Sequence, residues 1–201
     1  VFTEGIQNNH EGFGLREDVA EESRQYPFAN HPLWQDKIAR VWDIEIPILV
    51  VASYSNVLHT DGTFRAWRQL GSKEKWLRIH DSLEWQDYYE PKYVEERLRF
   101  FDYYMKSIDN GWKDTPTVRY CLHDMEGGIK IDQPATQFPP TNTEYKKYYL
   151  NGLARQLQNE APTQDVPAIY LCESDAPKAS FYLPITEETS FIGYPKAHLY
   201  V

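Results

Sequence analysis

The spacing of apolar residues in the first part of the chain predicts strands that alternate with helices. A continuous apolar run from Ile46 to Ala52 is typical of a buried strand. Gly62 to Leu70 has the pattern of a helix, with Asp61 as its expected N-cap, and Trp76 to Ile79 predicts a second short strand. This alternation is typical of a parallel sheet covered by helices.

A longer helix is predicted next, and the spacing changes after it. One face of this helix carries apolar residues at steps of four and three, which are Val94, Leu98, Phe101, Met105 and Ile108. A face of this kind usually covers a sheet. Asn110-Gly111 is expected to end the helix, and the segment from Val118 to Leu122 alternates apolar and polar residues as a strand does. The change of period places a domain boundary near Trp112 to Pro116.

The rest of the chain predicts short strands separated by Gly, Pro and Asn, which is typical of a β-sandwich. These predicted strands are Tyr145 to Leu150, Ala168 to Cys172, Ser180 to Leu183 and Ala197 to Val201. The segment before the first strand is polar and irregular, with a helical pattern only from Trp34 to Trp42. The predicted fold class is α/β plus all-β, divided into residues 1–43, 44–113 and 114–201.

Composition and charge exclude several classes of partner. The chain of 201 residues is 41% hydrophobic, which is enough for a packed core, and its net charge of −9 argues against a nucleic-acid or anionic-membrane surface. No apolar run is long enough to cross a bilayer, and residues 1–20 lack the apolar core of a signal peptide. Because the first residue is Val1, we expect a processed or partial segment whose sheet edge is covered by the remainder of the same polypeptide.

The two cysteines, Cys121 and Cys172, both lie in predicted strands without a CxxC or Cys/His spacing. They predict buried free thiols rather than a bridge or a zinc site, which favours a reducing, cytoplasmic compartment. No pair of His or acidic residues recurs at ligand spacing, so neither a metal nor a cofactor is predicted. The sequence leaves the oligomeric state open, a homo-oligomer included.

Polar residues follow both predicted parallel strands, where such sheets place their ligands. After the first strand come Ser53, Tyr54, Ser55, Asn56 and His59, and after the second come His80, Asp81, Ser82, Glu84 and Trp85. Two histidines beside Asp61, Asp81 and Glu84 could carry general acid–base chemistry, because imidazole titrates near neutral pH and a carboxylate can orient it. The alternative is that these residues only make local hydrogen bonds in loops.

Three longer segments carry a family resemblance. They are IEIPILVVASYSNVLHTDGTFRAWRQL at 44–70, KEKWLRIHDSLEWQDYY at 73–89 and RLRFFDYYMKSIDNGW at 97–112. The chain resembles the late catalytic domain of the cocaine-esterase-like and X-Pro dipeptidyl-peptidase group of α/β-hydrolases. The resemblance implies that residues 1–43 leave a helical cap, that 44–113 are late hydrolase core and that 114–201 begin a jelly-roll β-sandwich.

The family's catalytic residues match this chain poorly. The triad order is nucleophile, acid, histidine, and no Gly-x-Ser-x-Gly elbow occurs, so the resemblance places the nucleophile upstream of Val1. Ser53 resembles the family's Ser-Tyr elbow but lacks its flanking glycines. The acid position falls on Ser55 or Asn56, and the histidine position falls near Glu84-Trp85. The usual acid and histidine are therefore expected to be substituted.

Three functions are compatible with this pattern. The first is a hydrolase or acyl-transfer enzyme for small-molecule esters or amides, with His80 or else His59 as base and Asp61, Asp81 or Glu84 as acid. Its substrate contacts would be Tyr54, Ser55, Asn56 and Trp85. The second is a hydrolase fold that catalyses a non-hydrolytic proton transfer or cyclisation with the same groups. The third is a non-catalytic scaffold or binding protein.

Overall fold

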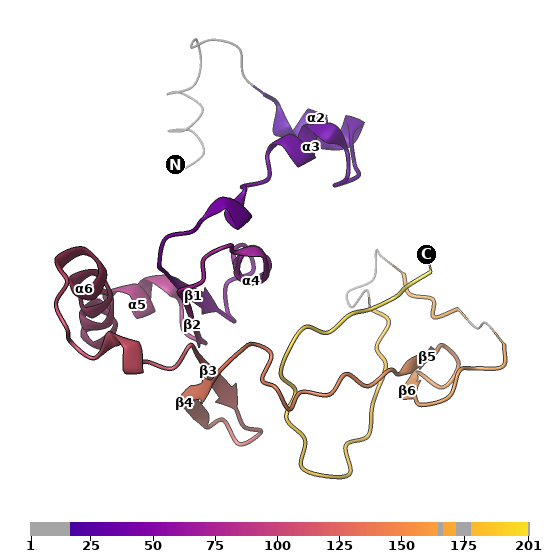
Figure 1. The fold of residues 1–201 in the computed structure, drawn as a ribbon. Helices are drawn as coiled ribbons and strands as arrows, with labels where there is room; N and C mark the ends of the chain where they lie inside the picture. Colours follow the sequence, from indigo (N-terminus) through magenta and orange to yellow (C-terminus); the bar gives the residue numbers. More distant parts are fainter. Residues whose placement is uncertain (1–16, 165–166, 172–177, 201) are drawn as a thin grey trace.

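The structure of the chain is a computed structural model that describes residues 17–164, 167–171 and 178–200 (Figure 1). The helices are α2 (Val19–Gln25), α3 (Pro32–Asp36), α4 (Thr60–Gln69), α5 (Glu84–Tyr89) and α6 (Pro91–Lys106), with short 3-10 turns η1 (Val41–Asp43) and η2 (Trp112–Asp114). The strands are β1 (Ile48–Ser53), β2 (Lys75–His80), β3 (Val118–His123), β4 (Ile129–Ala135), β5 (Tyr149–Asn151) and β6 (Gln156–Gln158). Among the described residues, no helix combines the length and the apolar character needed to cross a bilayer.

The central feature is a four-stranded sheet in the order β1-β2-β3-β4. β1, β2 and β3 are parallel, with Ser53 opposite His80 and Leu77 opposite Val118, while β4 pairs with β3 in the antiparallel direction. The predicted strands over 46–52 and 76–79 are thus present as β1 and β2. β3 and β4 lie beyond the boundary at 113 yet continue the same sheet, so the division into 44–113 and 114–201 stays a prediction.

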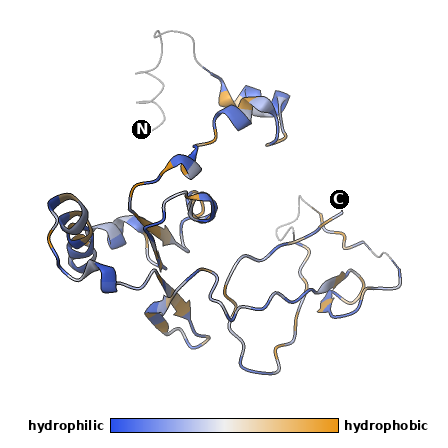
Figure 2. Cartoon of the chain, in the orientation of Figure 1, coloured by the Kyte–Doolittle hydropathy of each residue, from blue (hydrophilic) through white to orange (hydrophobic). Residues whose placement is uncertain are grey.

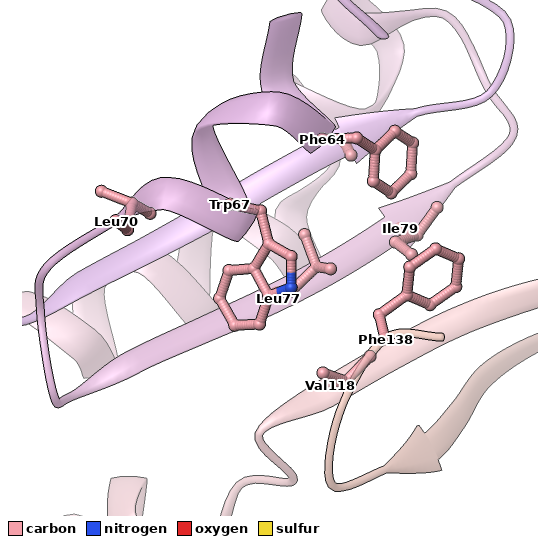
Figure 3. Packing of buried hydrophobic residues seen from close by; sticks show 8 residues of the cluster. Phe64, Trp67, Leu70, Leu77, Ile79, Val118 and Phe138 are labelled. Atoms are coloured by element: carbon pink, nitrogen blue, oxygen red, sulfur yellow. The ribbon is translucent and has the colours of Figure 1, made fainter. Parts of the chain in front are cut away.

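α4 connects β1 to β2 and packs on the sheet, as the sequence predicts. The main apolar core lies between them (Figure 3) and consists of Ala52, Phe64, Trp67, Leu70, Leu77, Ile79, Val118 and Phe138. The predicted N-cap was wrong, because the helix begins at Thr60 and His59 occupies the cap position. Asp61 lies instead in the first turn, where a negative charge favours the helix dipole, and its carboxylate is 2.9 Å from Nε of Arg65.

α6 confirms the predicted long helix, but it packs with the face opposite to the expected one. The expected apolar face is exposed, from 36% at Val94 to 77% at Met105. Phe100 is buried against Trp76 and Trp112, with ring centroids 6.3 and 5.2 Å away. Aromatic packing and burial of the ion-paired Glu96 on the same face select this orientation.

α6 also ends earlier than the sequence predicts. Its last residue is Lys106, and Ser107 follows in a left-handed conformation with φ of 56°. Gly111, with φ of 73°, instead precedes η2. The expected helical stretch from Trp34 to Trp42 is likewise divided into α3 and η1, and α2 was not predicted.

The segment after β4 has little regular structure. β5 pairs with β6, and Tyr182 adds a single bridge to Gln156. The strand expected over 145–150 is thus reduced to β5, and within the described residues 168–171 and 197–200 form no strand. Figure 2 shows apolar residues along the four-stranded sheet and a mixture of apolar and polar residues along this later segment. The β-sandwich therefore stays a prediction.

One of the two cysteines can be placed. Cys121 lies in β3, is buried and is a free thiol, as expected. Burial raises the pKa of the Cys121 thiol to about 11. Cys172, together with Val201 at the end of the last expected strand, lies outside the described residues.

Candidate functional site

The carboxyl ends of β1 and β2 lie side by side, so the polar residues after them meet at one edge of the sheet. Ser53 is opposite His80 in the parallel register, and the backbone N–H of Tyr54 donates to the carbonyl of His80 at 2.8 Å. The Oγ atoms of Ser53 and Ser55 each donate to the carbonyl of Ser82 at 2.9 Å. These bonds tie the loop after β1 to the loop after β2.

His59 and Glu84 form a pair across the two loops. Nδ1 of His59 lies 3.0 Å from Oε2 and 3.1 Å from Oε1 of Glu84. His59 immediately precedes α4, and Glu84 is the first residue of α5. The His59 side chain is 63% exposed and the Glu84 side chain 30%. The pair is therefore open to solvent.

Asn56 fixes the turn that carries His59. Its side-chain oxygen accepts from the backbone N–H groups of Leu58 and His59, both at 2.8 Å. The hydroxyl of Thr60 donates to the carbonyl of Ser53 at 2.5 Å, which closes the same turn onto the end of β1. Such Asx turns give a loop a defined conformation. Asn56 thus supports His59 through the backbone.

The geometry of this pair suits a general base. A carboxylate accepts hydrogen bonds only, so the ring proton belongs on Nδ1 of His59 and the lone pair on Nε2. Within the described part of the chain, no hydrogen bond occupies Nε2. A carboxylate on Nδ1 orients the imidazole and stabilises its protonated form, which is the role of the acid in a catalytic triad.

His80 has different surroundings. Its ring is buried, and its Nδ1 lies 3.1 Å from Oγ of Ser82 and 3.6 Å from Oδ1 of Asp87. Burial lowers the pKa of His80, and the carboxylate of Asp87 acts in the opposite direction. Ser82, His80 and Asp87 have the residue types of a triad, but both contacts use Nδ1. A triad instead needs the hydroxyl on Nε2 and the carboxylate on Nδ1, so these three residues do not form one.

The other acids proposed for these histidines lie elsewhere. Asp61 pairs with Arg65, and Asp81 has a carboxylate oxygen 3.7 Å from Nε2 of His123. Of the three expected acids, only Glu84 contacts one of the two candidate histidines, and that histidine is His59. The catalytic roles of His80, Glu84 and His59 stay predictions.

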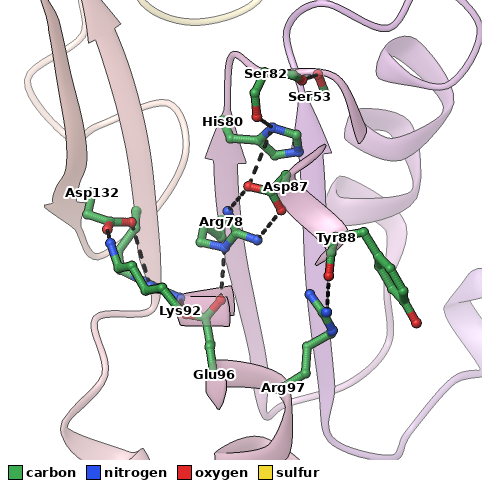
Figure 4. A network of polar contacts seen from close by, with 11 residues as sticks. Ser53, Arg78, His80, Ser82, Asp87, Tyr88, Lys92, Glu96, Arg97 and Asp132 are labelled. Carbon is green, nitrogen blue, oxygen red and sulfur yellow. Dashed lines mark hydrogen bonds and ion pairs between the residues drawn. The ribbon is translucent and has the colours of Figure 1, made fainter. Parts of the chain in front are cut away.

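A buried ionic network lies beneath the strand ends (Figure 4). Arg78 in β2 is 1% exposed, and its Nη1 and Nη2 donate to both oxygens of Asp87 at 2.7 and 2.6 Å. Nε of Arg78 donates to Glu96 at 2.9 Å, and Glu96 also contacts Arg119. This network was not predicted from the sequence. A charged residue between Leu77 and Ile79 in a buried strand was the signal that a buried acid had to accompany it.

The expected substrate contacts differ in exposure. Tyr54 stacks on Phe64 with ring centroids 6.4 Å apart, and burial raises the pKa of its hydroxyl. Ser55 and Asn56 make the loop hydrogen bonds given above, whereas Trp85 is 72% exposed beside Glu84. Their role in substrate binding stays a prediction. Over residues 17–164, 167–171 and 178–200, no cluster of three or more His, Cys, Asp or Glu side chains could hold a metal ion.

Comparison with known proteins supports the family resemblance. Residues 110–201 match the family model of the X-Pro dipeptidyl-peptidase C-terminal non-catalytic domain. Two crystal structures of a CocE/NonD family hydrolase from Staphylococcus aureus match with 35% sequence identity and a TM-score of 0.63. The chain is thus similar to proteins of the X-Pro dipeptidyl-peptidase and CocE/NonD group. The resemblance found in the sequence is thereby confirmed.

The match to the CocE/NonD hydrolase covers 72% of this chain and 26% of the other, so the chain spans about a quarter of its length. No curated protein matched. A mixed sheet with helices, followed by the C-terminal domain match, is compatible with part of a hydrolase of this family. His59 and Glu84 both precede residue 110, where the match to the non-catalytic domain begins.

Proposed function

We propose that this chain is the late part of an α/β-hydrolase catalytic domain followed by the opening of a jelly roll. We propose further that the complete polypeptide cleaves or transfers the acyl group of small-molecule esters or amides. In this reaction His59 is the general base and Glu84 is its orienting acid. The single observation that supports the assignment is the 3.0 Å contact between Nδ1 of His59 and the Glu84 carboxylate at the carboxyl edge of a parallel sheet.

The pair explains why the family's usual triad positions look substituted. The resemblance places the family's acid after the strand that corresponds to β1 and its histidine after the one that corresponds to β2. Here His59 follows β1 and Glu84 follows β2. An acid and a histidine that have exchanged places across neighbouring strand ends still form a hydrogen-bonded pair. A triad is recognised by geometry and roles rather than by chain order.

The proton steps follow from this geometry. A nucleophilic hydroxyl, expected upstream of Val1, attacks the acyl carbon as its proton passes to Nε2 of His59. The imidazolium is stabilised by Glu84, which keeps its own charge. His59 then gives the proton to the departing alcohol or amine, and an acyl-enzyme remains. Water, deprotonated by His59, attacks the acyl-enzyme to release the acid and restore the hydroxyl, or a second alcohol or amine takes the acyl group.

The surroundings of the pair favour a substrate with an apolar group. Trp85 is 72% exposed next to Glu84, and Val57 and Leu58, which precede His59, are 95% and 81% exposed. Exposed apolar side chains next to both members of an acid–base pair in the sequence can hold an apolar acyl or alcohol group by burying its surface. Trp85 is the predicted contact that best suits this role.

A serine-directed fluorophosphonate probe tests the proposal in the full-length polypeptide. The wild type should be labelled, and His59→Gln should lower the labelling rate by about a hundredfold or more, because the nucleophile loses its base. His123→Gln is the matched control, since His123 is a half-exposed histidine with an acid contact at another strand end. Its labelling rate should equal that of the wild type.

Two results would contradict the proposal. Equal labelling of the wild type and His59→Gln would show that His59 is not the base. A wild type that turns over its substrate but is never labelled would favour the second function, a proton transfer or cyclisation without a covalent intermediate.

A further inference from the structure

We infer that Asp87 is a positioning residue, which holds Glu84 in place for His59 by anchoring α5 to the buried Arg78. The inference rests on the function proposed above, because it concerns the same acid–base pair. Asp87 lies three positions after Glu84 on α5, so the two carboxylates belong to neighbouring turns of one short helix. Whatever fixes Asp87 therefore also fixes Glu84.

α5 has little apolar packing of its own. It is a six-residue helix, too short to be stable without external contacts, and Asp87 is its only buried residue. The exposed aromatic residues of the helix are Trp85, Tyr88 and Tyr89. An additional contact comes from α6, where the Arg97 guanidinium lies 4.1 Å from the centroid of the Tyr88 ring. The buried anchor of α5 is thus a carboxylate and not an apolar side chain.

The Arg78–Asp87 contact is suited to fix orientation as well as position. Oδ1 of Asp87 accepts from Nη1 of Arg78 and Oδ2 accepts from Nη2, and the two donors of a guanidinium have a rigid relative geometry. A single hydrogen bond would let α5 rotate about it. Two parallel bonds prevent that rotation, so they constrain the direction in which the helix presents Glu84.

Arg78 is itself held firmly. It lies in the middle of β2, paired with Val51 on one side and Arg119 on the other. Its Nε donates to Glu96 of α6, and its guanidinium lies 3.7 Å from the centroid of the Tyr93 ring. The contact between Asp87 and Arg78 thereby fixes the position of Glu84 relative to the centre of the sheet. In the same way, the turn held by Asn56 fixes the position of His59 relative to the end of β1.

The test compares variants in the full-length polypeptide. Asp87→Asn keeps the shape but removes the charge, and it should lower kcat by about tenfold or more, since displacement of a catalytic group by about 1 Å can cost a hundredfold. In a Glu84→Gln background the same substitution should change kcat by less than about twofold, because Asp87 acts through Glu84. This loss of additivity separates a positioning role from general destabilisation.

Glu96→Gln is the matched control. It removes the other carboxylate that binds Arg78, but it leaves both bonds between Arg78 and Asp87 in place, and the pairing of β2 with β1 and β3 still fixes the backbone of Arg78. Both variants should unfold at lower denaturant concentration than the wild type, while Glu96→Gln should keep kcat within about twofold. If Asp87→Asn does not fold, Arg78→Lys is used in its place, because lysine keeps the charge and loses the paired donors. Its kcat is expected to fall as for Asp87→Asn.

The outcomes distinguish the inference from the proposed function. If Glu84→Gln leaves kcat unchanged, the acid–base pair itself is wrong and the proposed function fails. If Glu84→Gln lowers kcat but Asp87→Asn does not, or if the two effects multiply independently, the pair stands and the positioning role of Asp87 is overturned. An equal fall of kcat in Glu96→Gln would also overturn it.

Discussion

His59 and His80 follow neighbouring strands of one sheet, yet their rings have opposite surroundings. His80 is the last residue of β2 and is buried, with Ser82 and Asp87 both near its Nδ1. His59 lies beyond the end of β1 in a turn held by Asn56 and is exposed, with a carboxylate on Nδ1. The residue types around the two rings are alike, and the contacted atoms and the exposure differ.

The difference teaches that an acid near a histidine is not enough to make a base. At His59 the carboxylate occupies one ring nitrogen and leaves the other for a substrate or nucleophile. At His80 the acid is already committed to Arg78 through two short hydrogen bonds. This difference is why we propose acid–base chemistry for the exposed pair and a structural role for the buried group.

The largest expected effect is a loss of stability when the buried ionic network around Arg78 is broken. Arg78→Met should lower the free energy of unfolding of the full-length polypeptide by about 3–5 kcal/mol, because it leaves Asp87 and Glu96 as buried carboxylates without their shared partner. Urea unfolding measures this loss. Arg65→Met, which removes an exposed ion pair with Asp61, is the control and should leave stability nearly unchanged. Equal stability of the two variants would contradict the buried network.

Breaking the exposed His59–Glu84 pair should lower kcat without changing the free energy of unfolding. Glu84→Gln keeps the size of the side chain but removes the charge that stabilises the His59 imidazolium. We expect kcat to fall by about a hundredfold, with unchanged urea unfolding. Steady-state kinetics of the full-length polypeptide check this, and a variant with wild-type kcat would remove Glu84 from the reaction.

The turn that carries His59 should have a smaller effect. Asn56→Ala removes the acceptor of two backbone hydrogen bonds and should cost about 1 kcal/mol of stability and a few-fold in kcat. Asn151→Ala is a matched control, because Asn151 accepts from the backbone N–H groups of Leu153 and Ala154 in β5–β6. The control should cost similar stability and leave kcat unchanged. Equal kcat in both variants would contradict the role of the Asn56 turn.

The smallest effect is the pH dependence contributed by His80. Burial lowers the pKa of His80, so the unfolded state binds a proton more readily than the folded state as the pH falls below the ordinary value of about 6.5. Stability is therefore lost on going down through this range. His80→Gln cannot take up the proton, and its unfolding free energy should fall less between about pH 7 and about pH 5 than that of the wild type. An unchanged pH slope would show that His80 is not a buried neutral group.

The sequence predicted the elements of the sheet better than their packing. The apolar run at β1, the helix α4 and the strand β2 were all expected, because each has a local pattern of apolar residues. The buried face of α6 was not expected. It is decided by contacts with residues of other elements, because Phe100 packs on Trp76 and Trp112 and Glu96 pairs with Arg78. Packing partners distant in sequence decide such choices, and the apolar period of one helix does not contain them.

For the site, the sequence predicted which residues meet but not how they pair. The strand ends brought both loops to one edge, as the parallel topology requires. The sequence did not indicate that Glu84 would contact His59 while Asp87 lay beside His80. That pairing depends on where α5 begins and on which of its residues points to Arg78. The family resemblance supplied the expected roles of an acid and a histidine. It did not indicate that the histidine would follow β1 and the acid would follow β2.

The most direct test of the His59–Glu84 assignment is kcat for His59→Gln and His80→Gln, measured side by side in the full-length polypeptide. The exposed pair predicts a loss of about a hundredfold or more for His59→Gln and a change within a few-fold for His80→Gln. A large loss in His80→Gln together with wild-type turnover in His59→Gln would contradict the assignment.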